Sequence, residues 1–266
     1  MIVKKGYSSD LTPFQWKKIK HLFPRPKSGK GLSGRPSSDL FQVVNGIFYL
    51  IRTGCQWRMI PHSYGNWSTL YGYFNRWSSQ GILEKVMDWL RRKERQRQGR
   101  KPDPSAGCVD SQSIRTRTQG LEVGIDGGKR VKGRKRHVLS DSLGIPLEFE
   151  VTAANVSDRE GLKTLLTHYF EKGINRLRHL WVDGGYSGEA LAVWVASLKK
   201  TFKIGLELVE KEGKGFNGIK HRWVVERTWA WLANFRRNSR DYETLVRNSI
   251  AILQLSTIHL LIRRLA

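Results

Sequence analysis

The hydrophobic period of this chain changes near residue 100, and that change limits its possible folds more than any other feature. Before it, apolar residues recur at helical spacing, as in Leu40–Ile51. After a polar, basic stretch at Gln96–Pro104, apolar and polar residues alternate instead, most cleanly over Pro146–Ala153. Strands, followed by strand-helix-strand-helix order, predict a mixed α/β fold. We therefore expect two domains, an all-helical one at 1–100 and an α/β one at 101–266 that includes a C-terminal helix.

The net charge indicates the class of partner. Lys and Arg number 47 against 23 Asp and Glu, which gives a formal charge of +24 and a pI near 10.4. Such an excess is typical of proteins that bind polyanions. Membrane-surface proteins concentrate their charge on one amphipathic helix, whereas here it is spread along the whole chain. Nucleic acid is therefore favoured over an anionic membrane.

Several other classes of protein are excluded by simple patterns. The two cysteines, Cys55 and Cys108, are too few for a disulfide framework, and no histidines are spaced to complete a zinc site. The first residues lack the apolar segment of a signal peptide. The most apolar stretch, Leu245–Ile262, is interrupted by polar residues, so it predicts a buried helix rather than a membrane span. A cytoplasmic protein is expected.

Helix boundaries can be read in the N-terminal half. Ser9 or Thr12 is expected to cap a first helix, and Asp39 to open a strongly apolar one that ends near Gly54. Ser157 begins a capping-box pattern in the second half, where a further helix should follow the alternating segment. These signals set where the elements begin and end.

A later helix of the N-terminal half has a polar face. It is expected to begin at Ser68 or Thr69 and to run through Trp77. Two helices with a short turn in a basic protein are typical of a helix-turn-helix-like module, but a plain bundle for packing or dimerisation explains the pattern equally well. If this helix reads bases, the candidate residues are Ser68, Thr69, Asn75 and Arg76.

Three acidic residues indicate the chemistry. Asp183 follows an apolar strand-like run and precedes a Gly-Gly turn, Asp110 lies on the first expected strand, and Glu226 lies within a late helix. The long gaps between them allow intervening strands to fold back and bring all three carboxylates to one sheet edge. Hard oxygen ligands of this kind hold the Mg²⁺ or Mn²⁺ ions of two-metal phosphoryl transfer. The pattern indicates a metal-dependent nuclease or strand-transfer enzyme, with Asp126 and Asp141 as rival ligands.

Basic residues near these acids are candidates for phosphate contact. Arg222 lies one turn before Glu226, where it forms either an ordinary salt bridge or a contact to the DNA backbone. A short basic stretch is expected to bind phosphate, with a solvated hairpin as the alternative. Its members are Lys129, Arg130, Lys132, Arg134, Lys135 and Arg136. Asn155 and Asp158 either hydrogen-bond near the site or cap the next helix.

Specific motifs surround these residues along nearly the whole chain. In the second half they are Val109–Arg115, Asp126–Lys129, Lys132–His137, Ala153–Arg159, Trp181–Tyr186 and Arg222–Thr228. In the first half they are Gly54–Pro61 and Gly65–Trp67. With these motifs the chain resembles the bacterial insertion-sequence transposases, and more narrowly the "insertion sequence four and five" group of the DDE superfamily.

The resemblance implies an RNase H-like catalytic domain, a mixed sheet flanked by helices, with Asp110, Asp183 and Glu226 as the catalytic and metal-binding triad. It implies two Mg²⁺ or Mn²⁺ ions per active site. It also implies that the N-terminal helices help bind the terminal inverted repeats of the element. Double-stranded DNA, as repeats and as target, is then the partner. Because two ends must be held together, we expect at least a homodimer on DNA, in the bacterial cytoplasm at the nucleoid and not at a membrane.

The chain departs from the family pattern near Glu226. A tyrosine before the arginine and a basic residue after the glutamate are replaced by Ile219 and Ala233, and Arg236 or Arg237 is expected to substitute for the latter. The triad is intact, so we expect a DNA transposase that frees 3′-hydroxyl ends by hydrolysis and joins them to target DNA. Two alternatives stay open: a nuclease that stops at hydrolysis, and a catalytically silent DNA-binding regulator derived from a transposase.

Overall fold

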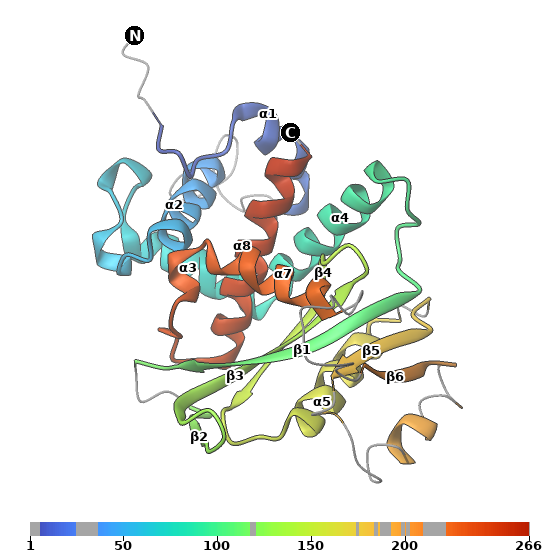
Figure 1. Ribbon diagram of the computed structural model, residues 1–266. Helices are drawn as coiled ribbons and strands as arrows, with labels where there is room; N and C mark the ends of the chain where they lie inside the picture. The colour runs from blue at the N-terminus through green and yellow to red at the C-terminus, as the bar shows by residue number, and fades with distance from the viewer. Residues whose placement is uncertain are drawn as a thin grey trace.

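The computed structural model describes residues 6–24, 37–117, 121–173, 176–183, 186, 193–197, 200, 203–209 and 222–265. Its N-terminal half is helical and its second half is a mixed sheet covered by helices on both faces (Figure 1). The expectation of a mixed α/β fold behind a helical segment is therefore confirmed. The helix expected over Glu189–Lys199 lies largely outside the described residues.

In the described part of the N-terminal half, the structure has four α-helices and three short 3₁₀ helices. They are α1 (Pro13–Ile19), α2 (Leu40–Thr53), η2 (Trp57–Met59), η3 (His62–Tyr64), α3 (Trp67–Ser79) and α4 (Ile82–Arg97), with η1 (Lys20–Leu22) continuing α1. Thr12 caps α1 through a capping box, and Asp39 caps α2 by accepting a hydrogen bond from the Phe41 amide. Gly54 ends α2 with φ of +71°, a conformation that favours glycine.

The cap of α3 differs from the expectation. Asn66, and not Ser68 or Thr69, is its N-cap, because the Asn66 side chain accepts a hydrogen bond of 2.9 Å from the Ser68 amide. Ser68 and Thr69 therefore lie inside the first turn, where both side chains are exposed. Asparagine caps as well as serine does, so propensity alone does not separate the three positions.

In the described part of the chain, six strands form one sheet. They are β1 (Ala106–Arg115), β2 (Gly124–Asp126), β3 (Val131–Asp141), β4 (Pro146–Ala153), β5 (His179–Asp183) and β6 (Gly205–Val209). The strands β1, β3 and β4 are antiparallel neighbours, and short β2 also pairs with β3. On the other side of β1, β5 and then β6 join in parallel. The antiparallel and parallel parts of the sheet thus meet at β1.

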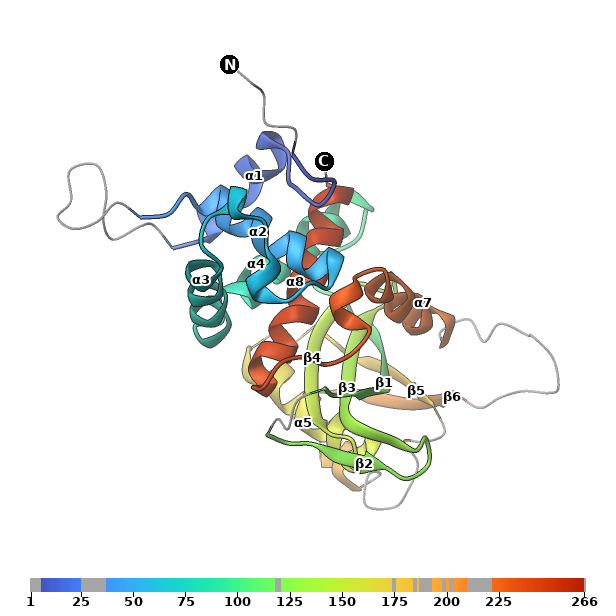
Figure 2. The ribbon, with the colours of Figure 1, turned by 90° about the vertical axis from the view of Figure 1, so that its left-hand side faces the viewer.

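The two faces of the sheet have separate cores. On one face α5 (Asp158–Glu171) covers a cluster that includes Val109 and Val182. On the other, Cys108 and Phe149 join a larger cluster with α7 (Arg222–Ala233), α8 (Val246–Arg264) and the N-terminal helices. Figure 2 shows α8 running from those helices to the β4 side of the sheet. The helical and α/β parts therefore share a hydrophobic core.

The C-terminal helix α8 is buried along most of its length, as expected for Leu245–Ile262. It packs against α2, α3, α4 and β4, so its apolar residues face protein on several sides. Among the residues that the structure describes, no helix combines the length and the apolar character needed to cross a membrane.

The alternation expected over Pro146–Ala153 is interrupted once. The pairing of β3 with β4 shifts from Leu139 opposite Glu148 to Ser140 opposite Pro146, which leaves Leu147 as an extra residue. This bulge turns Leu147 to the α5 face, while Phe149 stays on the other face. The alternation expected over Pro146–Ala153 places Leu147 and Phe149 on one face of the strand, and in this respect it was wrong.

Candidate active site

Asp110 and Asp183 lie on β1 and β5, which are adjacent parallel strands in the middle of the sheet. In the parallel pairing of β1 with β5, Cys108 is opposite Trp181, and each aspartate follows two residues later on its strand. Cys108 and Trp181 face the core beneath the helical layer. Because side chains alternate with period two, both aspartates are directed to that same face of the sheet, toward α7.

The surroundings of Asp110 favour the neutral acid. Burial raises the pKa of Asp110 to about 6, and the negative charge of Asp183 contributes in the same direction. Opposing this, the Ser111 backbone and the indole of Trp229 donate hydrogen bonds that favour the charged form. The Trp229 Nε1–H donates to Asp110 Oδ2 over 3.0 Å. Two repelling carboxylates in a half-buried position fit a hard cation, whose charge would relieve both the repulsion and the burial.

Glu226 lies on α7, the helix that packs on β1 and β5. Val224 and Val225 anchor the helix in the core, Glu226 is exposed, and Trp229 follows one turn later in contact with Asp110. Within the described ranges, no three His, Cys, Asp or Glu side chains are close enough to hold one metal ion. The structure thus joins Asp110 to Asp183 and places Glu226 on the adjoining helix without closing a three-ligand cluster. The Gly184–Gly185 turn lies outside the described residues.

The rival acids have other partners. Asp126 accepts hydrogen bonds from the Ser113 hydroxyl and, over 3.0 Å, from the Lys129 amide in the turn between β2 and β3. Asp141 pairs with buried Arg95 and accepts from the backbone amides of the turn that follows β3. Both aspartates therefore stabilise turns, which accounts for them without a metal.

The chain matches two family descriptions. Residues 101–261 match the "Transposase DDE domain", and residues 11–87 match the "Putative transposase of IS4/5 family". The chain belongs to the DDE transposase family. The match to the DDE domain covers the sheet, α5, α7 and most of α8, and so includes all three predicted acids. No solved structure matches the chain.

Two relatives come from one insertion element of Burkholderia cepacia. The chain is 34% identical over 114 residues to the putative transposase for insertion sequence element IS402, covering 40% of this chain and 51% of the relative. It is 30% identical over 112 residues to an uncharacterized 16.2 kDa protein of that element, covering 41% of this chain and 75% of the relative. The chain thus spans about half the length of the first of these relatives.

Three residues of the basic stretch, Arg134, Lys135 and Arg136, are buried in the DDE domain. Arg134 is 0% exposed and Arg136 is 2% exposed, and Lys135 is nearly as buried. Arg134 donates hydrogen bonds of 2.7 to 2.9 Å to the Glu243 and Thr244 carbonyls and to the Ser249 hydroxyl, and it forms an ion pair with Asp241.

The expectation that these three residues contact phosphate is therefore corrected. Arg136 donates to the Asn238 carbonyl over 2.9 Å, and Lys135 forms an ion pair with Asp158 at the start of α5. From Gly133 onward β3 is an inner strand covered on both faces, so its alternating side chains enter protein there. The exposed members of the stretch are Lys129 and Arg130, in the turn before β3, and Lys132, the second residue of β3.

The two arginines that follow α7 also differ in burial: Arg236 is exposed and Arg237 is buried. Arg237 is buried, forms an ion pair of 2.6 Å with Glu243 and donates to the Cys55 carbonyl. It is thereby excluded as a substitute for the family's basic residue, because its charge is compensated inside the protein. Arg236 is exposed and stays a candidate. Arg222 begins α7, but its side chain, like Ile219, lies outside the described part.

Three of the four predicted base-reading residues are exposed on α3. Ser68, Thr69 and Arg76 are exposed, whereas Asn75 is partly buried. Asn75 Oδ1 accepts a hydrogen bond of 3.2 Å from Arg247 at the start of α8. Arg247 was not anticipated, because 172 residues separate it from Asn75.

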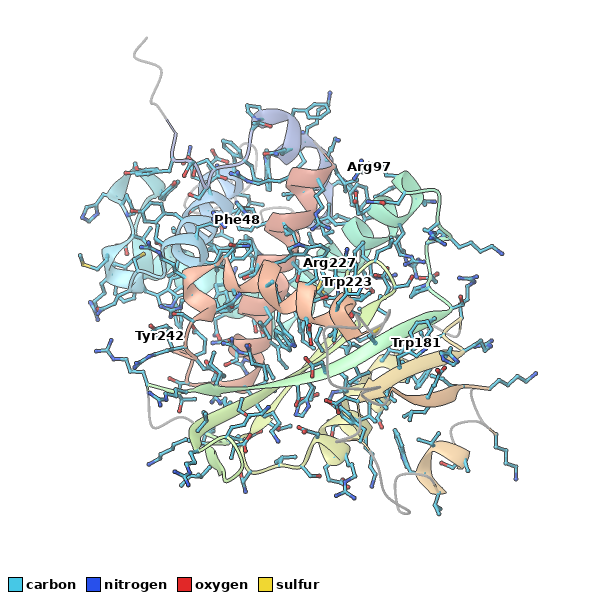
Figure 3. All side chains as sticks on the ribbon, in the orientation of Figure 1. Phe48, Arg97, Trp181, Trp223, Arg227 and Tyr242 are labelled. Carbon is cyan, nitrogen blue, oxygen red and sulfur yellow. The ribbon has the colours of Figure 1, made fainter. Side chains whose placement is uncertain are left out.

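Alternating tryptophan and arginine side chains stack along α7 beside Glu226. Arg227 lies 4.2 Å over the Trp223 ring and 4.9 Å over the Trp231 ring, and Arg264 of α8 covers Trp231 at 4.0 Å. Figure 3 shows Trp223 and Arg227 projecting from α7 on the helical side of the sheet. Arg227 also donates to the Leu143 carbonyl, so the stack holds α7 to the turn after β3.

Trp229 packs against the larger core cluster and also binds Asp110, and sequence reasoning missed this second contact. Its position three residues after Glu226 was the available signal, since residues three apart share a helix face. A side chain on the helix face of the predicted catalytic acid is well placed to reach Asp110. Asp158, by contrast, was expected either near the site or as a cap; Ser157 is the cap, and Asp158 binds Ser111 next to Asp110.

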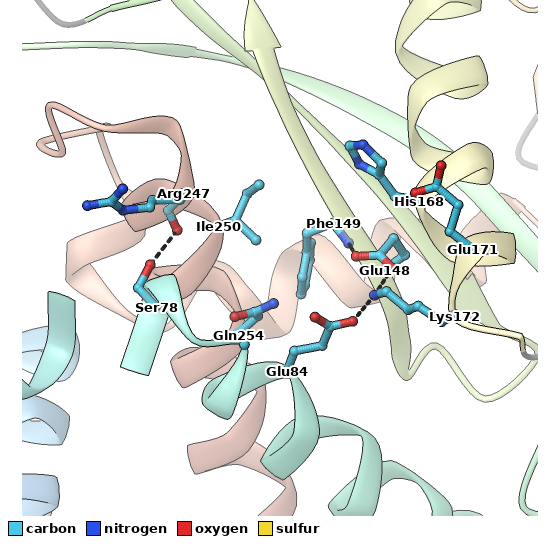
Figure 4. Close-up of a pocket in the computed structure, with 11 residues that line it drawn as sticks. Ser78, Glu84, Glu148, Phe149, His168, Glu171, Lys172, Arg247, Ile250 and Gln254 are labelled. Atoms are coloured by element: carbon cyan, nitrogen blue, oxygen red, sulfur yellow. Dashed lines mark hydrogen bonds and ion pairs between the residues drawn. The ribbon is translucent and has the colours of Figure 1, made fainter. Parts of the chain in front are cut away.

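A separate cavity lies away from the predicted acids. Its volume is about 400 Å³, and it is lined by residues of α3, α4, β4, α5 and α8 (Figure 4). Lys172 lies between Glu84 and Glu148 and forms an ion pair with each. Burial raises the pKa of Glu148 to about 7, against the lowering effect of Lys172. None of Asp110, Asp183 and Glu226 lines this cavity.

Proposed function

We propose that the chain is the DNA transposase of an insertion sequence. The observation that carries the proposal is the adjacency of Asp110 and Asp183 on parallel strands beneath the helix that bears Glu226, within a DDE domain match. The strand arrangement supports an RNase H-like domain, because three antiparallel strands are extended on the β1 side by two parallel ones. The N-terminal helices are proposed to form a DNA-binding domain.

The proposed metal ligands are Asp110, Asp183 and Glu226, holding two Mg²⁺ or Mn²⁺ ions. Their carboxylates are hard oxygen donors, and the pair on β1 and β5 carries a repulsion that a cation would relieve. Divalent ions held by these carboxylates would supply activation of the attacking water or 3′-hydroxyl and stabilisation of the leaving oxygen. Closure of the third ligand would require the Glu226 side chain to turn toward the two aspartates from its exposed position on α7.

The remaining roles belong to the protein's own side chains. Trp229 holds one oxygen of Asp110, which fixes the direction of the other. Exposed cations at Lys129, Arg130, Lys132 and Arg236, together with Arg222, are proposed to hold the phosphate backbone. The positive charge of Lys129 is near enough to lower the pKa of Asp110, which supports its placement beside the site.

Double-stranded DNA is the proposed partner, as terminal inverted repeats and as target. A formal charge of +24 supports a polyanionic partner. Two ends must be held in one complex, so a homodimer or larger assembly on DNA is proposed, at the nucleoid of a bacterial cytoplasm. A nuclease that stops at hydrolysis shares the same site, and a silent regulator would share only the binding surfaces.

Cleavage of terminal-repeat DNA by the Asp183→Asn variant tests the proposal. The change removes a metal ligand and adds no negative charge, so we expect cleavage and strand transfer to be lost while DNA binding is kept. Asp88→Asn is the matched control, because Asp88 lies on α4 in an ion pair with Arg91. Undiminished cleavage by Asp183→Asn would reject the triad. Products that end at hydrolysis would identify a nuclease, and no cleavage by the wild type would identify a regulator.

A further inference from the structure

A polar cluster lies on the reverse face of β1, directly behind Asp110. The Ser111 hydroxyl donates to Asp158 Oδ1 over 2.7 Å, and the Lys135 ammonium lies 3.0 Å from the same oxygen. We propose that Asp158 is a positioning residue for the catalytic site: it holds β1 at Ser111 so that Asp110 is presented to the metal on the opposite face. This inference rests on the proposed function.

Asp158 connects three elements at one atom. Ser111 lies on β1, Lys135 on β3, and Asp158 is the first residue of α5. Lys135 also donates to the Val156 carbonyl over 2.8 Å, so its ammonium is fixed from two directions. The Ser157 hydroxyl, and not Asp158, caps α5. The Asp158 carboxylate is therefore available to the sheet.

The start of α5 is seated closely on the sheet, which fixes Asp158. A Cβ atom on Gly161 would lie 2.1 Å from the His137 ring, so only glycine permits this approach. His137 is opposite Ser111 in the pairing of β1 with β3. Any shift of α5 away from His137 would pull Asp158 away from Ser111. The cluster thus couples the position of a helix to one residue of β1.

The coupling reaches Asp110 through the backbone. Ser111 and Asp110 are consecutive on a strand, so their side chains leave on opposite faces and rotate together about the strand axis. Tyr186, three residues after Asp183 in the sequence, is 2% exposed and is close enough to Asp158, Asp110 and Asp183 for all three charges to act on its hydroxyl. The reverse face of the sheet therefore holds side chains that lie close to both β1 and β5, the strands that carry the two proposed metal-binding aspartates.

A purely structural ion pair is the alternative explanation. Asp158 retains 31% of its side-chain exposure, so its pairing with Lys135 is partly screened. Glu160 offers a matched comparison: it also lies in the first turn of α5 and pairs with Lys163 over 2.8 Å, but it faces solvent. If the role of Asp158 were only to stabilise α5, the two acids would behave alike.

The test measures Mn²⁺ binding to the full-length protein without DNA, by calorimetry or electron paramagnetic resonance, alongside thermal unfolding. Asp158→Ala and Ser111→Ala are each expected to weaken Mn²⁺ binding by about tenfold, as changes behind metal ligands do. Together they should weaken it little more than either alone, because both break the same hydrogen bond. Ser111→Thr keeps the hydroxyl and should restore wild-type binding. Glu160→Gln should leave binding unchanged even where it lowers the unfolding temperature.

Three other outcomes would reject either the positioning role of Asp158 or the proposed metal site itself. Wild-type Mn²⁺ affinity in Asp158→Ala or Ser111→Ala rejects the positioning role, and Ser111→Ala keeps the test valid where Asp158→Ala does not fold. Equal losses in Asp158→Ala and Glu160→Gln also reject it, in favour of a structural pair. If the wild type shows no saturable Mn²⁺ binding that Asp183→Asn diminishes, the proposed metal site itself is wrong and the inference falls with it.

Discussion

Trp229 is the residue through which α7 touches Asp110. Its indole donates to one carboxylate oxygen, and the ring lies one turn beyond Glu226. A hydrogen bond to a charged acceptor contributes about 1.5–3 kcal/mol, and about 1.4 kcal/mol corresponds to a tenfold change in rate. The contact is therefore strong enough to affect catalysis without being a metal ligand.

We predict that Trp229→Phe lowers the rate of metal-dependent cleavage about tenfold, since it removes one such hydrogen bond and keeps an aromatic ring. Single-turnover cleavage of terminal-repeat DNA measures the rate, and a filter-binding assay should show unchanged affinity. Trp231→Phe is the matched control, because its ring stacks with Arg227 and Arg264 rather than with Asp110. A wild-type rate in Trp229→Phe would contradict this role for the indole.

Arg134 is a buried cation that forms an ion pair with buried Asp241 and so stabilises the fold. We predict that Arg134→Met destabilises the fold by about 3–5 kcal/mol, because it leaves the buried Asp241 carboxylate uncompensated. Urea unfolding measures the loss. Lys132→Met, two residues earlier on the same strand and exposed, should change stability by less than about 0.5 kcal/mol. Wild-type stability in Arg134→Met, together with weaker DNA binding, would restore the phosphate role for Arg134.

At the scale of elements, the β2–β3 hairpin and α3 present different surfaces. The hairpin carries Lys129, Arg130 and Lys132 in exposed positions, and α3 carries exposed Arg76 next to partly buried Asn75. Cations on a hairpin suit phosphate contacts, which position the duplex but carry little sequence information. A helix with amide and guanidinium groups suits the major groove.

We predict that the two elements divide DNA binding between them. Neutralising Lys129, Arg130 and Lys132 to glutamine should weaken binding equally on all sequences, and the salt slope should fall by roughly one for each phosphate that the variant no longer neutralises. Changing Asn75 and Arg76 to alanine should instead reduce the preference for terminal repeats over random DNA. Salt-dependent titrations with both DNAs distinguish the two. The proposed division of roles would be refuted if the hairpin variant selectively lost its preference for terminal repeats. It would also be refuted if the α3 variant kept that preference unchanged.

At the scale of the whole molecule, α8 ties the ends of the chain together. His259 of α8 is buried between Phe48 and Phe235 and binds the Ser9 carbonyl over 3.0 Å. Burial lowers the pKa of His259 to about 4, against the raising effect of the hydrogen bond to Ser9. The unfolded chain therefore takes up a proton at this residue at higher pH than the folded chain does.

This linkage fixes the sign of a pH effect. Between about pH 6.5 and pH 4 the unfolded state binds more protons at His259, so the wild type should lose stability there as the pH falls. We predict that His259→Gln is less stable than the wild type at pH 7.5 but loses less on acidification, by up to about 3 kcal/mol. Urea unfolding at several pH values measures the difference. A constant difference across this range would show that His259 does not titrate on unfolding.

Much of the fold follows from local signals in the sequence. The change from helical to strand period, the caps at Thr12 and Asp39, and the bounds of β4 all match the structure, because caps and periodicity depend on neighbouring residues. The bulge at Leu147 does not follow, since it depends on pairing with β3. The division into two domains stays a prediction, as does the catalytic triad.

The sequence by itself determined the mixed α/β class, the family motifs and the candidate acids, because residue type and local spacing carry that information. Only the tertiary structure decided which charges are free. In the sequence, buried Arg134 and Arg237 cannot be told apart from their exposed neighbours Lys132 and Arg236. In the structure, the charge of Arg134 is compensated by Asp241 and that of Arg237 by Glu243. Likewise, the contacts from Trp229 to Asp110 and from Asp158 to Ser111 join residues that are far apart in the chain. A side chain's electrostatic role depends on burial and partners, and both are set by packing.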